Sequence, residues 1–203
     1  MIAIINYGLG NLHSVKKAVA FVGGEAVVTD DSQEIFSAKK VILPGVGAFA
    51  DGMAGLESRS LVTVVREVAA SGKPILGICL GMQLLFEESR EQGQHSGLGL
   101  LKGSVVPFPG NEIKIPQIGW NQLEICASSN LLDGVKNGDY FYFNHGYYCI
   151  PEDSNDVLTM TNYGIRFASS VKHGMVFGVQ YHPEKSQKIG LQVLKNFVEL
   201  SDA

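Results

Sequence analysis

The stretch Lys73-Pro-Ile-Leu-Gly-Ile-Cys-Leu-Gly-Met-Gln-Leu-Leu-Phe-Glu87 decides the fold of this chain. Its apolar first part predicts a buried strand from Pro74 to Ile78, and its second part predicts a helix from about Leu80. Cys79 stands at the junction, with one glycine two residues before it and another two residues after it. This spacing is typical of a sharp strand-to-helix turn that carries a nucleophile, where neighbouring backbone segments come close together.

Such a turn gives a cysteine the surroundings of a nucleophile. The N-terminus of the following helix favours the thiolate form of Cys79. The N–H of Leu80 is left free to donate to an oxyanion. The alternative is a buried structural cysteine, because free cysteine is among the most buried residue types. The flanking Gly77 and Gly81, together with the strand before and the helix after, favour the nucleophile.

The first half of the chain alternates between predicted strands and predicted helices. The strands are Ile2–Ile5, Ala26–Thr29 and Val41–Leu43, and helices with apolar residues at helical spacing run from about Leu12 to Val22 and from Leu61 to Ala69. Strands that alternate with helices indicate a doubly wound α/β sheet whose strands are mostly parallel.

The second half contains strand-like segments in succession, with turn residues between them. They are residues 100–107, 121–125, 139–150, 157–161, 166–171 and 175–181. Successive strands without helices favour antiparallel pairing, so we expect a mixed central sheet and a second small antiparallel sheet. A last helix is predicted from about Gln187, with Ser186 as its N-cap. No linker or repeat interrupts the chain, so we expect one domain over residues 1–203.

Composition excludes several classes of function. The chain has 203 residues, a formal net charge of −4 and no basic cluster, so neither nucleic acid nor a membrane surface is an expected partner. Its three cysteines are widely spaced, which predicts neither a disulfide framework nor a metal site, and a reducing cytoplasm fits best. The start, Met1–Asn6, has neither a basic region nor a cleavage site, and its apolar run is too short to span a bilayer.

Two glycine-rich loops follow predicted strands. The first, Asn6–Asn11, resembles the first turn of a dinucleotide-binding fold, but His13 stands where the third glycine would be. A plain turn, or a loop that contacts substrate or partner, is therefore the better interpretation. The second, Pro44–Phe49, lies at the carboxyl end of a strand, where ligands bind in parallel sheets. It is either a structural turn or the source of a second oxyanion donor, from Val46 or Gly47.

A thiol nucleophile needs a base, and the base needs a group that orients it. His182 is the one histidine followed two residues later by a carboxylate at a strand end, Glu184. Pro183 disfavours helix at His182, and residues two apart in an extended chain face the same way. Glu184 can therefore bind one ring nitrogen of His182 and leave the other for Cys79. A surface His-Pro-Glu turn is the alternative for this segment taken alone.

His145 is the competing base. It lies in the aromatic run Phe141–Tyr148, which favours a packed or hydrogen-bonded histidine that lines the pocket. His95 lies between polar residues and glycine, so it is predicted to be in a loop.

Three motifs together resemble the class I glutamine amidotransferases. Gly77-Ile-Cys-Leu-Gly-Met-Gln83 is similar to their nucleophile turn, Tyr181-His-Pro-Glu184 to their histidine and glutamate, and Pro44-Gly-Val-Gly47 to their oxyanion loop. The resemblance implies a flavodoxin-like fold and hydrolysis of L-glutamine to glutamate and ammonia, with Cys79, His182 and Glu184 as the catalytic triad and no cofactor or metal.

Longer matches resemble the glutaminase subunits of imidazole glycerol phosphate synthase. They are Asn6–Val15, Pro44–Phe49, Cys79–Ser89, Ile118–Asn121 and His182–Ser186. The resemblance implies a heterodimer in which a (β/α)8-barrel cyclase uses the ammonia to form imidazole glycerol phosphate and AICAR in histidine biosynthesis. It also implies that Gln83, the backbone of Gly47, and the segment His145-Gly146-Tyr147 hold glutamine. Asn11, Trp120 and Lys185 would face the cyclase, with Lys185 either coupling the two sites or simply solvated.

Two positions depart from that pattern. Gln117-Ile118 stands where His-Met is usual, and Gly146 stands where serine or threonine is usual. The departure at Gln117 leaves open ammonia supply to another synthase, such as a surface-sugar amidation enzyme with a duplicated glutaminase. A different thiol hydrolase, such as a peptidase, and a non-catalytic binding subunit are further alternatives. An intact Cys, His and Glu set argues against the last of these.

Overall fold

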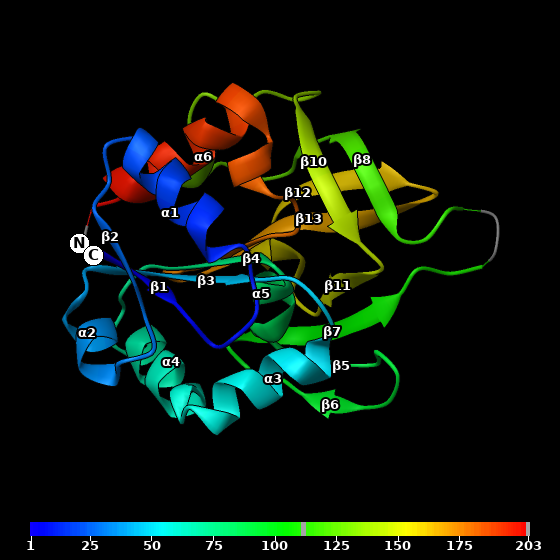
Figure 1. Ribbon diagram of the computed structural model, residues 1–203. Helices are drawn as coiled ribbons and strands as arrows, with labels where there is room; N and C mark the ends of the chain where they lie inside the picture. Colours follow the sequence, from blue (N-terminus) through cyan, green and yellow to red (C-terminus); the bar gives the residue numbers. More distant parts are fainter. Residues whose placement is uncertain (111–112, 202–203) are drawn as a thin grey trace.

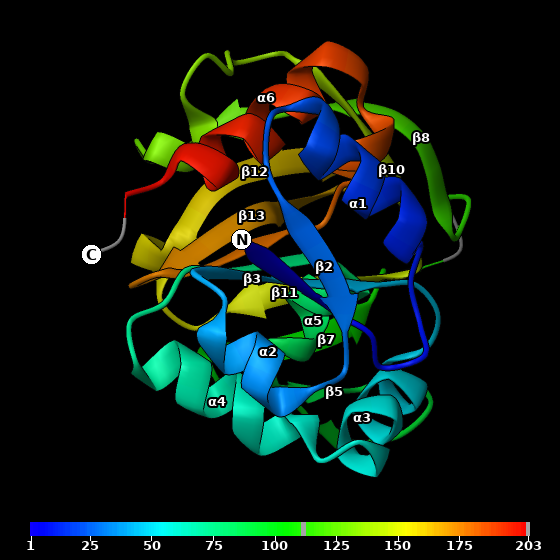
Figure 2. The same ribbon diagram turned by 60° about the vertical axis from the view of Figure 1, so that its left-hand side comes forward.

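The computed structural model describes residues 1–110 and 113–201. A central sheet lies between two groups of helices (Figures 1 and 2). One face is covered by α1 (Leu12–Phe21) and α6 (Gln187–Glu199), and the other by α2 (Ser32–Ser37), α3 (Phe49–Ser58) and α4 (Leu61–Ala70). None of the helices in the described part of the chain has the length and apolar character needed to cross a membrane.

Twelve of the described strands form the central sheet, and its path runs β2-β1-β3-β4-β14-β13-β11-β7-β5-β6, with β12 beside β13 and β9 beside β12. They are β1 (Ile2–Ile5), β2 (Ala26–Thr29), β3 (Lys40–Gly45), β4 (Ile75–Cys79), β5 (Phe86–Ser89), β6 (His95–Ser96), β7 (Leu101–Pro107), β9 (Glu124–Ile125), β11 (Tyr147–Pro151), β12 (Val157–Tyr163), β13 (Ile165–His173) and β14 (Val176–Val179). Along this path the strands β2, β1, β3, β4 and β14 are parallel to one another, and β13 pairs with β14 in antiparallel orientation.

Side chains of the parallel strands are buried on both faces of the sheet. In β1, Ala3 and Ile5 belong to the apolar cluster beneath α2, α3 and α4, whereas Ile2 and Ile4 belong to the cluster beneath α1 and α6. This explains why β1 is a continuous apolar run rather than an alternating one. The two clusters fix the sheet between its helices.

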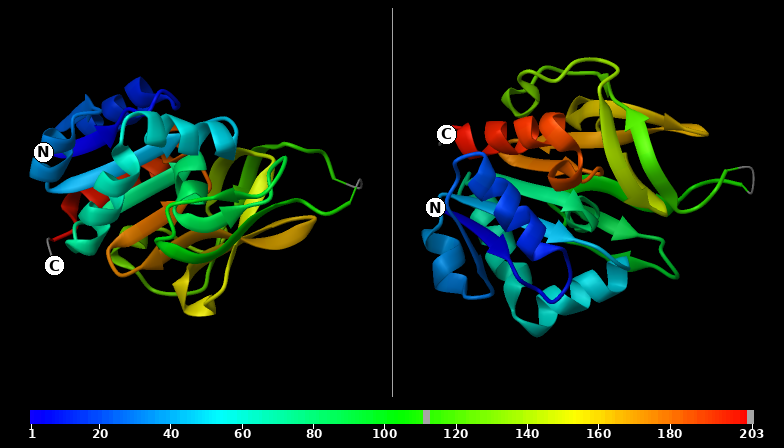
Figure 3. Two further views of the ribbon diagram at one scale, coloured as in Figure 1. Left: turned by 90° about the horizontal axis from the view of Figure 1, so that it is seen from below. Right: turned by 45° about the horizontal axis from the view of Figure 1, so that its top comes forward.

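A second sheet pairs β8 (Gln117–Gln122) with β10 (Tyr140–His145) in antiparallel register. It stands beside the start of α6, and its strand β8 lies next to β12 of the central sheet (Figure 3). The predicted fold class, a mixed and mostly parallel sheet flanked by helices with a second small antiparallel sheet, is confirmed. The strand-like segment 139–150 is in fact two strands, β10 and β11, which join different sheets because the chain changes direction at Gly146.

Several boundaries differ from the predictions. Helices α2 and α3 were not predicted, because α2 is short and α3 contains two glycines that weaken its helical pattern. Ser186 is the N-cap residue of α6, as predicted, but its side chain makes no cap hydrogen bond. Its Oγ instead donates to the His182 carbonyl at 2.7 Å and accepts from the Tyr142 N–H at 3.0 Å. These bonds tie β10 to the segment before α6.

Candidate active site

Cys79 is the last residue of β4, and α5 (Leu80–Leu84) begins directly after it. Its backbone has φ 53° and ψ −108°, a conformation that residues with a side chain rarely adopt and that costs about 1–3 kcal/mol. The turn therefore stores strain at the one residue whose chemistry the sequence marks out. β4 pairs with β3 in such a register that Gly45 lies opposite Cys79, so the loop after β3 is next to the sulfur.

Two glycines make this turn sterically feasible. A Cβ atom on Gly81 would lie 1.7 Å from the Leu43 carbonyl oxygen, and one on Gly77 would lie 2.7 Å from the Gly81 carbonyl group. Both distances are far below contact, and the obstacles are backbone atoms that cannot move aside. The close backbone approach predicted from the spacing is present.

His182 and Glu184 form a buried pair. The Nδ1 atom of His182 lies 2.9 Å from Oε1 of Glu184, and the two side chains are 3% and 2% exposed. His182 follows β14 and donates its backbone N–H to the Tyr142 carbonyl at 2.9 Å. The carboxylate reaches the ring from the 3-10 turn η3 (Pro183–Lys185) rather than from the extended segment that was predicted. The turn arises because Pro183 is compatible with the first position of a helix.

The other nitrogen of His182, Nε2, is buried and has no hydrogen-bond partner among the described residues. Burial of the ring lowers its pKa, but interactions with the Cys79 sulfur and with Glu184 outweigh burial and raise the pKa from 6.5 to about 9. The sulfur is thus close enough to affect the charge of the ring. The Cys79 Sγ itself lies 3.7 Å from the Asn144 carbonyl oxygen and 3.7 Å from Nε2 of Gln180.

A cleft of about 230 Å³ opens beside the sulfur. Its lining is Val46, Gly47, Cys79, Leu80, Gln83, Glu91, Asn144, His145, Gly146 and Tyr147. The structure therefore brings together both candidate oxyanion segments and all five predicted substrate-binding residues. Leu80 is the first residue of α5, and the first N–H groups of a helix have no partner within it.

Gln83 is held by two hydrogen bonds from its Nε2 atom. One goes to the Tyr147 carbonyl at 3.1 Å and the other to Oε1 of Gln180 at 3.2 Å. Both N–H groups of the Gln83 side chain therefore make hydrogen bonds within the protein, and its Oε1 atom is the group that can accept a hydrogen bond from a ligand. Gln180, fully buried, links Gln83 to the sulfur and was not among the predicted site residues. Its position two residues before His182, in the same segment after β14, is the signal that could have identified it.

Glu91 is a second residue that sequence reasoning missed. It is 9% exposed, lines the cleft, and accepts the backbone N–H of Phe49 at 2.8 Å through Oε2. This bond places a carboxylate at the N-terminus of α3, which is favourable for the helix dipole. In the sequence, Glu91 is one of several charged residues after the α5 segment, and no pattern distinguishes it from them.

His145 lies in the cleft wall as a neutral ring. Its Nδ1 atom lies 2.7 Å from the Tyr147 carbonyl oxygen, and its ring packs among Phe108, Phe143 and Phe167. Burial lowers its pKa to about 4, reinforced by the nearby charge of His182 and opposed by the bond to Tyr147. A ring of such low basicity is a poor general base near neutral pH.

The residues expected to face a partner lie outside the cleft. Trp120 is 43% exposed, and its ring lies 5.9 Å from that of Tyr142, while Nζ of Lys185 lies 5.7 Å from the Tyr142 ring. The Tyr142 ring in turn lies 6.4 Å from that of His182. Asn11 is exposed and accepts the Ser14 N–H at 3.3 Å, as the N-cap of α1.

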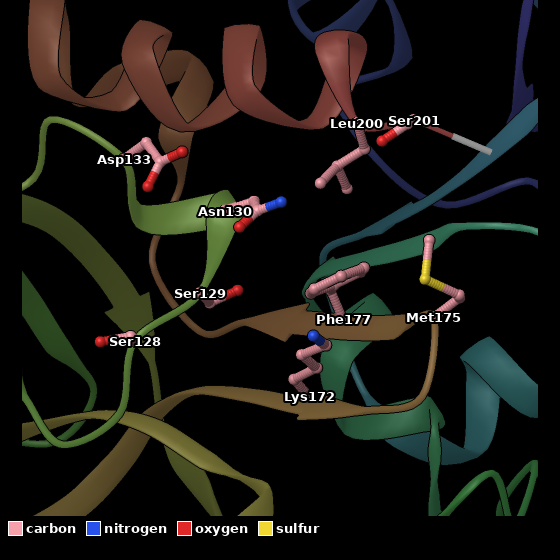
Figure 4. A pocket seen from close by; sticks show the side chains of 9 residues that line it. All are labelled: Ser128, Ser129, Asn130, Asp133, Lys172, Met175, Phe177, Leu200 and Ser201. Atoms are coloured by element: carbon pink, nitrogen blue, oxygen red, sulfur yellow. The ribbon is translucent and has the colours of Figure 1, made fainter. Parts of the chain in front are cut away.

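A different pocket, of about 400 Å³, lies near the opposite end of β14 from His182 (Figure 4). Its lining is Ser128, Ser129, Asn130, Asp133, Lys172, Met175, Phe177, Leu200 and Ser201. Met175 precedes β14, whereas His182 follows it, so this pocket is remote from the sulfur. It contains no predicted site residue. Within residues 1–110 and 113–201, no three His, Cys, Asp or Glu side chains gather in a way that could hold a metal ion.

Comparison with curated proteins finds relatives over nearly the full length. The chain is 54% identical to the imidazole glycerol phosphate synthase subunit HisH of Moorella thermoacetica, over 98% of this chain and 94% of the relative. It is 53% identical to the subunit of the same name from Aquifex aeolicus, over 96% of this chain and 94% of the relative.

Solved structures share the fold at low sequence identity. PurLQS from Thermotoga maritima superposes with a TM-score of 0.77 at 21% identity, covering 97% of this chain and 96% of that chain. A structure described as a glutamine amidotransferase superposes with a TM-score of 0.76 at 18% identity, covering 98% and 100%. The family model for class-I glutamine amidotransferases matches residues 3–200. From this match and from the relatives at more than half identity, the chain belongs to the class I glutamine amidotransferase family.

Proposed function

We propose that this protein, as one domain over residues 1–203, is the glutaminase subunit of an imidazole glycerol phosphate synthase. The observation that carries the proposal is the strained Cys79 at the end of β4, beside the buried pair of His182 and Glu184. A buried imidazole oriented by a carboxylate, with its second nitrogen unpaired and a sulfur nearby, fits nucleophilic catalysis by a thiol.

In the first step the Cys79 thiolate attacks the side-chain carbonyl carbon of L-glutamine, and a carbon–sulfur bond forms. The carbonyl oxygen becomes negatively charged. The Leu80 N–H and one amide of the second glycine loop, from Val46 or Gly47, donate hydrogen bonds to this oxygen and stabilise its charge. One such donor typically lowers the barrier by about 3 kcal/mol. Both segments line the cleft beside the sulfur, which supports this assignment.

His182 then donates its Nε2 proton to the amide nitrogen, the carbon–nitrogen bond breaks, and ammonia leaves. Amide nitrogen is a poor leaving group until it is protonated. Because Cys79 and Glu184 raise the pKa of His182 to about 9, the ring carries the required proton at neutral pH. Water, deprotonated by the now neutral ring, attacks the thioester. Glutamate is released, and the thiolate and imidazolium are restored.

The cleft also suits the amino-acid end of glutamine. The Oε1 atom of Gln83 and the carboxylate of Glu91 are acceptors for the α-ammonium group, and the buried carboxylate supplies the matching charge. Backbone groups of Gly47 and of the segment His145-Gly146-Tyr147 hold the other end. Backbone contact explains why glycine suffices at position 146.

Ammonia would become ammonium if it escaped to solvent, which favours a docked acceptor. We infer that a (β/α)8-barrel cyclase in the cytoplasm is this partner and forms imidazole glycerol phosphate and AICAR. The exposed Trp120 and Lys185, which meet at Tyr142 beside the His182 ring, support docking there. Asn11 would extend the same interface.

The test is Cys79→Ala in the complete chain. We expect glutamine hydrolysis to disappear while folding and co-purification with the cyclase persist, because the substitution removes only the nucleophile. Cys126→Ala is the matched control, since Cys126 is a free and exposed cysteine, and it should keep full activity. Glutaminase activity that survives in Cys79→Ala would end the proposal.

A further inference from the structure

Tyr7 is a buried tyrosine whose hydroxyl has no hydrogen-bond partner among the described residues. The residue follows β1 and is 1% exposed. A buried polar group without a partner costs about 1–3 kcal/mol. Such groups are rare in folded proteins, and each needs an explanation. The mechanism derived above leaves this hydroxyl without a role.

The hydroxyl lies between the oxyanion loop and the nucleophile turn. A Cβ atom built on Gly45 would lie 2.1 Å from the Tyr7 hydroxyl oxygen, 2.9 Å from Cβ of Leu80 and 3.2 Å from the Gly81 nitrogen. The hydroxyl thus fills the space that a side chain at position 45 would need. It contacts the loop that begins at Gly45, next to the residue that starts α5.

Contacts with α3 and with Arg59 fix the backbone of Tyr7. A Cβ atom on Gly55 of α3 would lie 2.4 Å from the Tyr7 carbonyl oxygen, so helix and residue are in close contact. The guanidinium of Arg59 donates to the same carbonyl at 3.2 Å. Burial, reinforced by the charge of Cys79, raises the pKa of the hydroxyl far above its ordinary value, so the group keeps its proton and can act only as a neutral donor or acceptor.

We propose that Tyr7 is a positioning residue for the oxyanion loop. When glutamine fills the cleft, the Tyr7 hydroxyl donates to the carbonyl of the Gly45–Val46 peptide. This carbonyl is bonded directly to the Gly45 Cα, beside which the hydroxyl lies. This hydrogen bond holds the N–H of the adjacent loop amide in the orientation that points toward the developing oxyanion. The inference rests on the proposed function, because it assigns a role to the loop at that same site. Tyr7 touches neither substrate nor sulfur in this arrangement and acts through the loop.

Tyr7→Phe tests the inference, because it keeps the ring and removes only the hydroxyl. We expect kcat for glutamine to fall about tenfold with little change in KM, since the loop amide acts in the transition state. The unfolding temperature should not fall, because the hydroxyl makes no bond in the free protein. Alkylation of Cys79 by iodoacetamide should keep its rate, because that reaction forms no oxyanion.

Tyr163→Phe is the matched control. It removes a tyrosine hydroxyl that donates to the Lys114 carbonyl at 2.7 Å, away from the cleft, and should leave kcat unchanged. Wild-type kcat in Tyr7→Phe would overturn the inference, and so would a loss of kcat that accompanies a lower unfolding temperature. If Cys79→Ala is inactive while Tyr7→Phe is normal, only the Tyr7 inference fails. An active Cys79→Ala removes the proposed site itself.

Discussion

At the scale of single residues, the charge of one buried imidazole decides when the proposed chemistry can run. Burial alone would make the His182 ring neutral, as it does for His145. The difference between them lies in their partners, because His182 has the Cys79 sulfur and a carboxylate at 2.9 Å, whereas His145 has a backbone carbonyl. Two histidines on neighbouring segments thus have opposite protonation states at neutral pH.

Glu184→Gln should therefore move the alkaline limit of activity. The wild-type protein should lose kcat/KM as pH rises through about 9, where His182 loses its proton. Without the carboxylate charge, the pKa of the ring falls and the limit should shift downward by about one pH unit or more. A pH–rate profile from pH 6 to 10 measures the shift. Glu67→Gln, which changes an exposed carboxylate on α4, is the control. An unshifted limit in Glu184→Gln would contradict the assignment.

The same pKa links folding stability to pH. A group whose pKa is higher in the folded chain stabilises the fold below its unfolded pKa of 6.5, and this contribution disappears as pH rises through about 9. The free energy of unfolding should therefore fall over that interval in the wild-type protein. In Glu184→Gln the fall should be smaller, which denaturation at pH 6 and pH 9.5 can detect.

At the scale of elements, the nucleophile turn depends on how closely three backbone segments approach each other. β3, β4 and α5 meet at Gly81, and no side chain fits between them. The strain at Cys79 is maintained because the strands on both sides of β4 are buried and paired. The position of the sulfur is therefore a property of the packed sheet rather than of the turn alone.

Gly81→Ala should destabilise the protein by about 3 kcal/mol or more, since its Cβ would lie 1.7 Å from the Leu43 carbonyl oxygen. Gly23→Ala is the comparison. Gly23 has φ +88° but open space around its Cβ position, so the cost there should be only about 1–2 kcal/mol. Urea denaturation of both variants measures the difference. Equal costs would show that packing at the turn is looser than the structure indicates.

At the scale of the whole molecule, the three predicted features of the site lie at one end of the sheet. The carboxyl ends of β3, β4 and β14 carry the glycine loop, the sulfur and the imidazole. The second sheet, β8 and β10, brings Trp120 to the same end. Catalytic site and proposed docking surface are therefore separated by one aromatic residue, Tyr142, which suits control of hydrolysis by a bound partner.

Trp120→Ala should weaken binding of the cyclase and reduce the increase in glutaminase activity that the cyclase causes. An exposed aromatic side chain at the centre of an interface commonly contributes 2 kcal/mol or more, roughly 30-fold in affinity. Basal hydrolysis and the unfolding temperature should change little. Phe21→Ala is the control, because Phe21 is 78% exposed at the far end of α1. Unchanged affinity in Trp120→Ala would place the partner elsewhere.

The sequence by itself determined the elements whose signal is local. The apolar runs at Ile2–Ile5 and Ile75–Ile78 indicate strands that are buried on both faces of the sheet, and the two glycines around Cys79 indicate the turn. The pairing of His182 with Glu184 was predictable because the two residues are neighbours in the chain. The family followed from the same short segments.

Only the tertiary structure decided which distant residues surround the sulfur. Gln180 reaches the sulfur and Glu91 reaches the cleft, each from a separate loop, and Tyr7 reaches the oxyanion loop from the opposite end of the chain. Glu91 and Tyr7 carry no local pattern, since a buried carboxylate or hydroxyl has no periodicity of its own, and Gln180 is marked by its spacing from His182 alone. Their positions follow from the order of strands in the sheet, which long-range packing sets and which no single stretch of sequence contains.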